Sequence, residues 1–579
     1  MKKVVALGAT VILSAVMAGC GTANKASAAA SSVHKPVYGG SAVVALPAQS
    51  PPNWFFPLLS LTADTTVNSE TNSLTYMPLL YFNKHDEFDS QHALAESINW
   101  NKAGTVYTIH LNPKWRWSNG HPVTAQDVVF TYDLMRAASL NNTHYSWTFS
   151  GQGFGGLPGL WKSVVAHGSD TVIVTINHPM NQQWFIRNGI NQIIPVPKSV
   201  WDKHPNNMTA ELAYINSVAN APSNPSYQVV DGPWKFSRDV PGAYWLYVPN
   251  AQYSGHKAYL SKLVLQYESS SASEFAALKS GTVTYGYLPA SLIKDSKELT
   301  HDVFHPEYSL AFNYVQINMS PQAPDHLGQA FSELPVRQAL QLGVDQTGII
   351  DSLYHGYGVM DDTTLAGRPQ TPFLDPALAH NPYAFNLQRG KELLLKNGWH
   401  EVNGVMTKGD MKLEFTLYGA SGSASYTAID ELLQQNWAKE GIVCNLEFQP
   451  FNTVVSYSVS DAPKWAVINW NGGWGYPSGY PSGGGLFETG GAENSGDYSS
   501  KTMNRLVEAT YLPGTTKQTL QRMYAFEEFA AKELPAVIFL PEFPQLTAHA
   551  SDLHNSVRTF NPVGGEIFPN EWWISKPSS

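Results

Sequence analysis

Apolar and polar residues follow one another along this chain with two different periods, one typical of strands and one typical of helices. Short runs that are rich in β-branched residues, or that alternate apolar with polar positions, predict β-strands. They lie at residues 40–46, 106–111, 171–176, 245–248, 262–267 and 465–469. Apolar residues spaced three or four positions apart predict helices at residues 67–80, 124–135, 272–279, 335–345 and 430–440. Strands and helices therefore alternate through most of the chain, which predicts an α/β fold.

Several predicted helices also carry residues that begin or end a helix. Thr124 stands three positions before Asp127, so the two side chains can cap the first helical turn together. Gly281 marks a turn after the helix predicted to end at residue 279, and Gly441 ends the helix at 430–440. We expect the strand that follows Gly441 to contain Cys444 as a small apolar residue.

The beginning of the chain has the layout of an export signal that ends at a cysteine. Two lysines precede an apolar run at residues 4–17, and two small residues stand before Cys20. The run is shorter than the roughly 20 residues of a membrane-spanning helix, so we expect a signal peptide over residues 1–19. Residues 17–20 resemble the lipobox of bacterial lipoproteins, which implies that Cys20 is acylated. An ordinary signal peptide with a cysteine near its cleavage site is the alternative.

Composition indicates a folded, exported protein. Residues 20–37 are small and polar and predict a lipidated flexible tether that spans roughly 20–25 Å as a coil. Beyond it, 43% hydrophobic and 12% aromatic residues are typical of globular proteins, and the length allows two or three domains. The formal net charge of −10 disfavours nucleic acid and anionic lipid as partners. Cys444 is the one thiol besides Cys20, so we expect no intrachain disulfide. The sequence also has no metal-binding spacing of Cys and His, and we expect no metal site and no cofactor.

Motifs in four regions of the chain match one protein family. They include Trp115-Arg-Trp-Ser-Asn-Gly120, Asp231-Gly-Pro-Trp-Lys-Phe236 and Trp470-Asn-Gly-Gly-Trp474. The full set of matching segments is residues 94–100, 107–111, 115–120, 122–130, 231–236, 249–260, 276–283, 336–345, 391–399, 437–441, 470–474 and 534–540. Together they resemble the family 5 extracellular solute-binding proteins of ABC importers, which include dipeptide- and oligopeptide-binding proteins.

The resemblance implies an architecture and a function. It implies a type II periplasmic-binding-protein fold of the large peptide-binding class, with two α/β lobes around a cleft and an extra domain inserted in the N-terminal lobe. The expected ranges are 38–80, 227–305 and 536–579 for lobe I, 81–226 for the inserted domain and 306–535 for lobe II. The implied function is to capture an extracellular solute, foremost a peptide, by hinge closure and to deliver it to the transmembrane subunits of an ABC permease. We expect a monomer without enzymatic activity, attached by its lipid to the outer face of the cell membrane or lying in the periplasm.

Residues 470–485 are the strongest candidate for ligand contact. They follow the predicted strand at 465–469 and predict a loop whose glycines let the backbone approach a ligand closely. Aromatic residues that merely cover the edge of the core are the alternative, although the position in the family favours the ligand. The candidate ligand-binding residues are Trp470, Asn471, Trp474, Gly475, Tyr476, Pro477 and Tyr480 in this segment and Asn53, Trp54, Tyr145 and Trp147 elsewhere.

One position departs from the peptide-binding relatives. Their aspartate that pairs with the peptide's α-ammonium aligns with Pro477, and residues 470–485 contain no acid. A buried ammonium without a counter-charge costs several kcal/mol to desolvate. The ammonium would therefore need another acid, for which Asp86, Glu87, Glu488 and Glu493 are candidates, or the ligand is an oligosaccharide whose rings stack on aromatic side chains.

A secreted hydrolase is the more distant alternative. Acids and histidines are plentiful, as paired-carboxylate or Ser-His-Asp catalysis would need. The sequence contains no Gly-x-Ser-x-Gly elbow, no His-Glu-x-x-His helix and no phosphate-binding glycine loop between a strand and a helix. The motifs therefore favour a binding protein, and we name no catalytic residue.

Overall fold

The computed structural model describes residues 35–140, 145–378, 382–458, 465–563 and 565–575. Cys20, the predicted signal peptide and nearly all of the predicted tether lie outside the described residues. From Pro36 onward the chain groups into a single unit. Within the part of the chain that the structure describes, no helix is long and apolar enough to cross a membrane.

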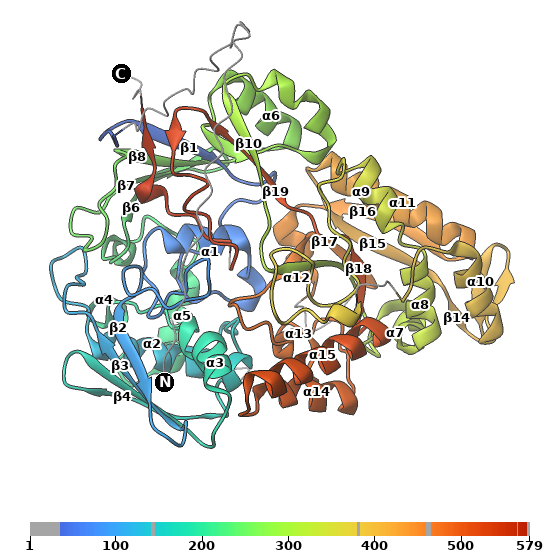
Figure 1. Cartoon of the computed structure of the whole chain (residues 1–579), viewed down its shortest axis with the longest axis horizontal. Coiled ribbons are helices and arrows are strands. Elements are labelled where there is room, and N and C mark those ends of the chain that lie inside the picture. Colours follow the sequence, from blue (N-terminus) through green and yellow to red (C-terminus); the bar gives the residue numbers. More distant parts are fainter. Residues whose placement is uncertain (1–34, 141–144, 379–381, 459–464, 564, 576–579) are drawn as a thin grey trace, which may run out of the picture. The chain divides into compact units, whose positions relative to one another are not determined.

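A seven-stranded mixed sheet collects strands from the beginning, the middle and the end of the chain (Figure 1). β1 runs parallel to β8 and β9, and the other neighbouring strands pair antiparallel. In order across the sheet, the strands are β10 (Asp302–Glu307), β19 (Gln545–Ala550), β9 (Tyr285–Tyr287), β1 (Ser41–Ala45), β8 (Lys262–Gln266), β7 (Tyr244–Pro249) and β6 (Trp234–Val240). The central strand β1 is thus covered on both edges.

A five-stranded sheet forms from the second half of the chain. Its strands are β16 (Val443–Gln449), β15 (Glu414–Ala420), β17 (Val467–Gly475), β11 (Ala311–Ile317) and β18 (Val537–Leu540), in that order. Every residue of β11 is buried, as expected for a strand with neighbours on both sides and covered faces. Residues 537–540 were assigned above to lobe I but pair here with β11, and the lobe ranges stay predictions.

Two adjacent chain segments connect these sheets. β10 continues into β11 through residues 308–310, and β18 continues into β19 through residues 541–544. β10 pairs antiparallel with β19, and β11 pairs antiparallel with β18. The four strands therefore form one two-stranded ribbon that passes from the seven-stranded sheet into the five-stranded sheet.

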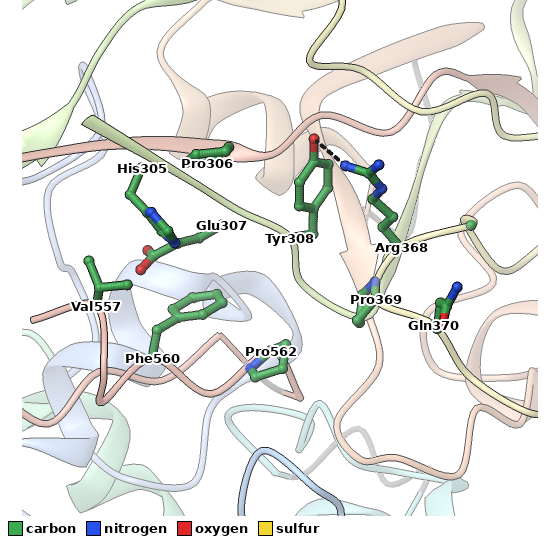
Figure 2. Close-up of a pocket in the computed structure, with 11 residues that line it drawn as sticks. His305, Pro306, Glu307, Tyr308, Arg368, Pro369, Gln370, Val557, Phe560 and Pro562 are labelled. Carbon is green, nitrogen blue, oxygen red and sulfur yellow. Dashed lines mark hydrogen bonds between the residues drawn. The ribbon is translucent and has the colours of Figure 1, made fainter. Parts of the chain in front are cut away.

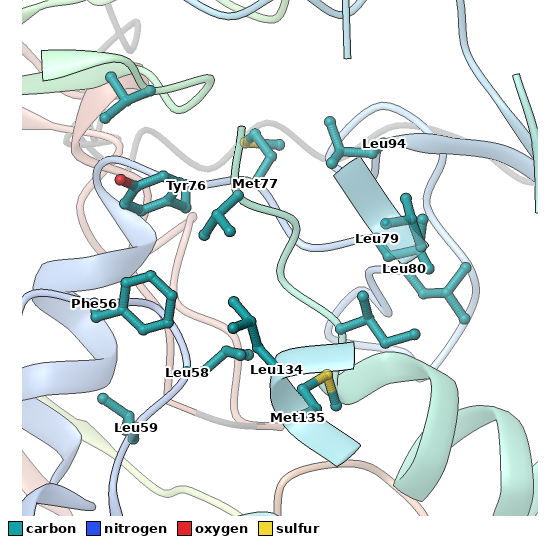
Figure 3. Close-up of a cluster of buried hydrophobic side chains, with 14 of the residues drawn as sticks. Phe56, Leu58, Leu59, Tyr76, Met77, Leu79, Leu80, Leu94, Leu134 and Met135 are labelled. Carbon is teal, nitrogen blue, oxygen red and sulfur yellow. The ribbon is translucent and has the colours of Figure 1, made fainter. Parts of the chain in front are cut away.

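A four-stranded antiparallel sheet lies within residues 95–176. Its strands, in order, are β2 (Ala95–Trp100), β3 (Val106–Leu111), β5 (Thr171–Ile176) and β4 (Trp161–His167). Helix α2 (Ala125–Ala138) packs on β4 and β5. Figure 3 shows Leu134 and Met135 of α2 beside Phe56, Leu58 and Leu79, so α2 shares a buried cluster with residues of the N-terminal segment.

The remaining regular elements are short strands and helices. The short strands are β12 (His400–Val402), β13 (Val405–Lys408), β14 (Met411–Lys412), β20 (Leu553–His554) and β21 (Trp573–Ile574). The other α-helices are α1 (Thr66–Ser73), α3 (Gln182–Trp184), α4 (Lys198–Trp201), α5 (Met208–Val218), α6 (Ser271–Ser280), α7 (Leu327–Ser332), α8 (Leu334–Leu342), α9 (Gln346–Ser352), α10 (Leu387–Lys396), α11 (Ala424–Glu440), α12 (Phe451–Ser458), α13 (Gly484–Phe487), α14 (Lys501–Tyr511) and α15 (Thr516–Glu533).

Most predicted elements are confirmed, and two differ for identifiable reasons. The predicted helix at 67–80 is wrong beyond Ser73, because the following residues bond instead to residues 231–234. The amide of Gly232 donates to the carbonyl of Thr75 at 2.8 Å, and the Asp231 carboxylate accepts from the amide of Met77 at 3.0 Å. The predicted strand at 465–469 continues to residue 475 as β17, so the expected loop begins later.

Candidate functional site

β17 carries the candidate tryptophans into the five-stranded sheet. It pairs antiparallel with β11, with Trp474 opposite Phe312 and Gly473 opposite Asn313. A Cβ atom on Gly473 would lie 2.3 Å from the carbonyl oxygen of Phe312. The glycine therefore allows the two backbones to approach, and this approach keeps the segment in the sheet.

Trp474 is partly buried between aromatic side chains from different parts of the chain. Its ring lies 5.9 Å from Phe312 and 4.7 Å from Tyr476, centroid to centroid. Phe154, from the short helix η2 (Phe154–Gly156), stacks on it with centroids 6.2 Å apart and planes 25° from parallel. Trp474 is thereby held where the residues around 154 meet the five-stranded sheet.

One carboxyl group bonds to the indole nitrogen of Trp474, and a second carboxyl group interacts with the first. Trp474 Nε1 donates to the Glu493 carboxylate, and Glu493 shares a hydrogen bond with Asp64. Asp64 directly follows the short helix η1 (Leu61–Ala63) and also bonds to Ser150. Two carboxyl groups can bond to each other when one of them carries a proton. The raised pKa of both groups favours a shared proton between them in the absence of another cation.

Burial governs the electrostatics of this carboxyl pair. It raises the pKa of Glu493 well above its ordinary value, and the neighbouring charge of Asp64 raises it further. Burial also raises the pKa of Asp64, against the lowering effect of its hydrogen bonds to Glu493 and Ser150. The Asp64 side chain nevertheless keeps a large water-accessible surface. A carboxyl group that protein encloses and water still reaches is accessible to a small cationic group.

The segment after β17 packs against residues 154–188. Asn188 Nδ2 donates to the Tyr480 carbonyl at 3.1 Å, and Trp184 Nε1 donates to the Ser482 hydroxyl at 3.2 Å. A Cβ atom on Gly485 would lie 2.2 Å from the ring of Phe154. The space beside Gly485 is therefore filled by the Phe154 side chain and not left open to a ligand.

The remaining candidates in residues 470–485 differ in exposure. Tyr476 and Tyr480 are buried, and their hydroxyls donate to the carbonyls of Thr364 and Thr510, each at 2.6 Å. Trp470 is partly buried between two hydrophobic clusters. Gly475 and Pro477 are exposed, whereas the side chain of Asn471 lies outside the described residues. A ligand contact stays a prediction for each of them.

The candidates outside this segment make contacts within the protein. The amide of Asn53 donates to Asn68 Oδ1 at 2.9 Å, and Asn68 Nδ2 donates back to Asn53 Oδ1 at 2.8 Å. Trp54 and Trp147 are buried with centroids 5.4 Å apart. Tyr145 is partly buried beside the same cluster. These contacts order the N-terminal segment, and ligand binding by these residues is likewise untested.

Of the four acids that sequence reasoning offered as replacements, Glu493 is the one that reaches Trp474. Asp86 pairs with Arg187, with 3.0 Å between Oδ1 and Nε, and Glu87 is exposed. Burial raises the pKa of Glu488 to about 7, and its carboxyl bonds to Tyr511. Asp64 was missed, because an aspartate just before a helix reads as a capping residue and nothing local connects it to residue 493.

Comparison with known proteins identifies the family. The family model "Bacterial extracellular solute-binding proteins, family 5 Middle" matches residues 90–493. The chain is 23% identical over 476 residues to the oligopeptide-binding protein AppA of Bacillus subtilis, covering 80% of each chain. It is 25% identical over 460 residues to the dipeptide-binding protein of Lactococcus lactis, covering 76% of this chain and 78% of that protein.

Solved structures share the fold. AppA from Bacillus subtilis in complex with a nonapeptide has a TM-score of 0.80 at 21% identity, over 94% of this chain and 100% of that chain. NikZ from Campylobacter jejuni in complex with Ni(L-His) has a TM-score of 0.74 at 20% identity, over 92% of this chain and 99% of that chain. The predicted two-lobe α/β fold is confirmed by this likeness. Because the family model covers most of the chain, the protein belongs to the bacterial extracellular solute-binding proteins of family 5.

Proposed function

We propose that this protein is the substrate-binding component of an ABC importer and that it binds a peptide with a free amino terminus. In this proposal the lobes close over the peptide, and the inserted domain at 81–226 covers one side of it. A lipid at Cys20 holds the protein beside the permease that receives the peptide, which raises the effective concentration of one for the other. The proposal excludes enzymatic turnover.

The carboxyl pair of Asp64 and Glu493 carries the proposal. An α-ammonium placed against the pair would replace the shared proton and receive two charge-assisted hydrogen bonds. Its positive charge would offset the desolvation of the carboxylates, which a neutral ligand cannot do. The Trp474 indole, which donates to Glu493, would hold that carboxylate in place. Glu493 and Asp64 thus supply the acid that is absent at Pro477.

Named relatives support a peptide. AppA of Bacillus subtilis is an oligopeptide-binding protein whose structure contains a nonapeptide, and the relative from Lactococcus lactis is a dipeptide-binding protein. An oligosaccharide carries no cation for the carboxyl pair, and the rings of Tyr476 and Tyr480 are buried within the protein. Fewer aromatic faces are thus left for stacking on sugars than the sequence indicated.

Peptides with free and acetylated amino termini test the proposal. We expect free tri- to penta-alanine to raise the melting temperature and to bind in calorimetry, because ligands of the native state stabilise it. Acetylation should weaken binding by roughly 10- to 100-fold, which corresponds to the free energy of a hydrogen bond to a charged group. Glu493→Gln keeps the shape of the side chain and should weaken the free peptides by a similar factor.

Glu96→Gln is the matched control. Glu96 is an exposed acid on β2, so its substitution should leave the affinity unchanged. Equal binding of acetylated and free peptides would show that the amino terminus is not recognised by a carboxylate. Stabilisation by oligosaccharides alone, with no response to any peptide, would show that the ligand class is wrong.

A further inference from the structure

A cavity of about 430 Å³ lies where the end of β10 meets two loops, at residues 367–370 and 557–562 (Figure 2). Its volume falls within the range of roughly 300–1,000 Å³ that small-molecule sites occupy. Val557, Phe560 and Pro562 give it an apolar wall. None of its lining residues is among the ligand candidates identified from the sequence, so the cavity is a separate feature of the molecule.

Glu307 presents a carboxyl group at one end of this cavity. Figure 2 shows the carboxyl group toward Val557 and Phe560 and away from Arg368. Glu307 is 4% exposed, and its Oε2 accepts from the hydroxyl of Thr547 at 2.7 Å and from that of Tyr285 at 3.4 Å. Its Oε1 has no hydrogen-bond partner among the described residues. A buried oxygen of this kind lacks a donor, and leaving it without one costs free energy.

Two further acids lie close enough to Glu307 to form an acidic cluster. Glu70 is on α1, and Glu566 is near the end of the chain. Burial raises the pKa of each to about 8, and the charges of Glu566 and Glu307 raise that of Glu70 further. Glu566 Oε2 also has no hydrogen-bond partner among the described residues. The ion pairs found in the part of the chain that the structure describes include none of these acids.

An organic cation fits the needs of this cluster. It brings the positive charge that offsets the desolvation of carboxylates and the N–H donors that their unpartnered oxygens lack. No group of three or more His, Cys, Asp and Glu side chains among the described residues is arranged to hold a metal ion. The apolar wall beside Glu307 suits an alkyl chain that carries the cationic group at its end.

We propose that this cavity receives a lysine or arginine side chain of the bound peptide, with the alkyl stem along Val557, Phe560 and Pro562 and the cationic head at Glu307. This inference rests on the proposed function and names its substrate class as peptides that contain a basic residue. Lysine and arginine bury their stems on apolar surface while the charged head reaches a polar partner. The net charge of −10 also attracts cationic peptides over a distance.

The position of Arg368 sets the direction of the side chain. Arg368 lines the same cavity but lies away from the Glu307 carboxyl group (Figure 2). Its charge repels a cation at that end, whereas Glu70 adds negative charge near Glu307. The cationic head is therefore directed to the acidic end of the cavity.

A positional series of tetra-alanine peptides tests this inference. Each alanine in turn is replaced with lysine, with norleucine, which keeps an alkyl stem without the charge, or with glutamate. At one position, lysine should bind the native protein about tenfold more tightly than norleucine in calorimetry, as expected for a charged hydrogen bond. Glutamate at that position should bind more weakly than norleucine. Glu307→Gln and Glu70→Gln should each reduce the ratio of lysine to norleucine affinity.

Glu298→Gln is the matched control, because Glu298 is an exposed acid at the end of the short helix η6 (Ala290–Glu298), before β10. It should preserve the ratio. Glu493→Gln should weaken both peptides by the same factor, which separates this cavity from the carboxyl pair. Circular dichroism checks that each variant folds.

The outcomes separate this inference from the proposed function. If alanine peptides bind but lysine nowhere exceeds norleucine, or if the ratio persists in Glu307→Gln and Glu70→Gln, this inference is overturned while the proposed function stands. Binding of spermidine or free arginine without any difference between lysine and norleucine peptides would also overturn it, because the cluster would then take a free amine. If no peptide of the series binds at any concentration, both are overturned.

Discussion

Asp64 and Glu493 would make the proposed binding site sensitive to protons. Both side chains have a raised pKa, chiefly because of burial, and they share a hydrogen bond that requires a proton. In the proposed complex, a peptide ammonium competes with that proton for the same oxygens. Binding and protonation are therefore linked, and each opposes the other.

Peptide affinity should rise with pH in mildly acidic solution. The free protein holds the shared proton above the ordinary carboxyl pKa of about 4, and the peptide complex does not, so binding releases up to about one proton. Calorimetry at pH 6 in buffers of different ionisation enthalpy measures this release. Acetylated peptides and Glu493→Gln should release none. An observed enthalpy that is the same in all buffers would exclude the proton exchange.

The sequence predicted some of these site residues and could not predict others. Trp474 and Glu493 stand in or beside a glycine-rich segment whose position in the family indicates ligand contact. Asp64 and Phe154 meet them only through tertiary structure, across more than 300 residues of chain, and neither has a local pattern that differs from an ordinary cap or core residue.

Among the helices and strands, regular apolar alternation and clear capping residues predicted the observed elements correctly. The alternating runs at 106–111 and 171–176 are β3 and β5 with the same bounds. The capping box of Thr124 and Asp127 starts α2 as predicted. Residues 470–475 were predicted as part of a loop because glycine is frequent in turns. They belong to β17 instead, where Gly473 lets the strand approach β11 closely.

Gly473→Ala should destabilise the protein by about 1–3 kcal/mol, the usual cost of overpacking. The added methyl would meet the Phe312 carbonyl oxygen at 2.3 Å and push β17 from β11. Gly472→Ala is the control, because its Cβ would have no atom within 4 Å, and it should stay within about 0.5 kcal/mol. Urea denaturation compares the three proteins. Equal midpoints for both variants would show that the strands tolerate a side chain there.

Across the whole molecule, buried carboxyl groups with raised pKa values make the folded state more stable at mildly acidic pH than at neutral pH. Burial raises the pKa of Glu440 and Glu527 to about 9 and that of Glu542 to about 8. Glu440 is fully buried, and neither of its carboxyl oxygens has a hydrogen-bond partner among the described residues. The folded state therefore binds more protons than the unfolded state from about pH 4.5 upward.

Stability should therefore fall as pH rises from 5 to 8. Glu440→Gln removes one titrating group while keeping a similar shape, and should reduce that fall by an amount on the order of 1–4 kcal/mol. Urea midpoints of both proteins at the two pH values measure the difference. Glu447→Gln, at an exposed position on β16, should leave the fall unchanged. A variant Glu440→Gln whose pH dependence matches the parent would show that Glu440 does not titrate in this range.

The two-stranded ribbon of β10, β11, β18 and β19 constrains how the protein can report that it is loaded. Strands that stay paired on both sides of residues 308–310 and 541–544 resist sliding past each other, because a slip would break both ladders at once. If the lobes close over a ligand as proposed, bending at those residues is the motion that the two ladders allow. In the proposed function, a bound ligand would then change the angle between the two sheets in the same way whatever its length, and the permease could recognise one closed shape for many different ligands.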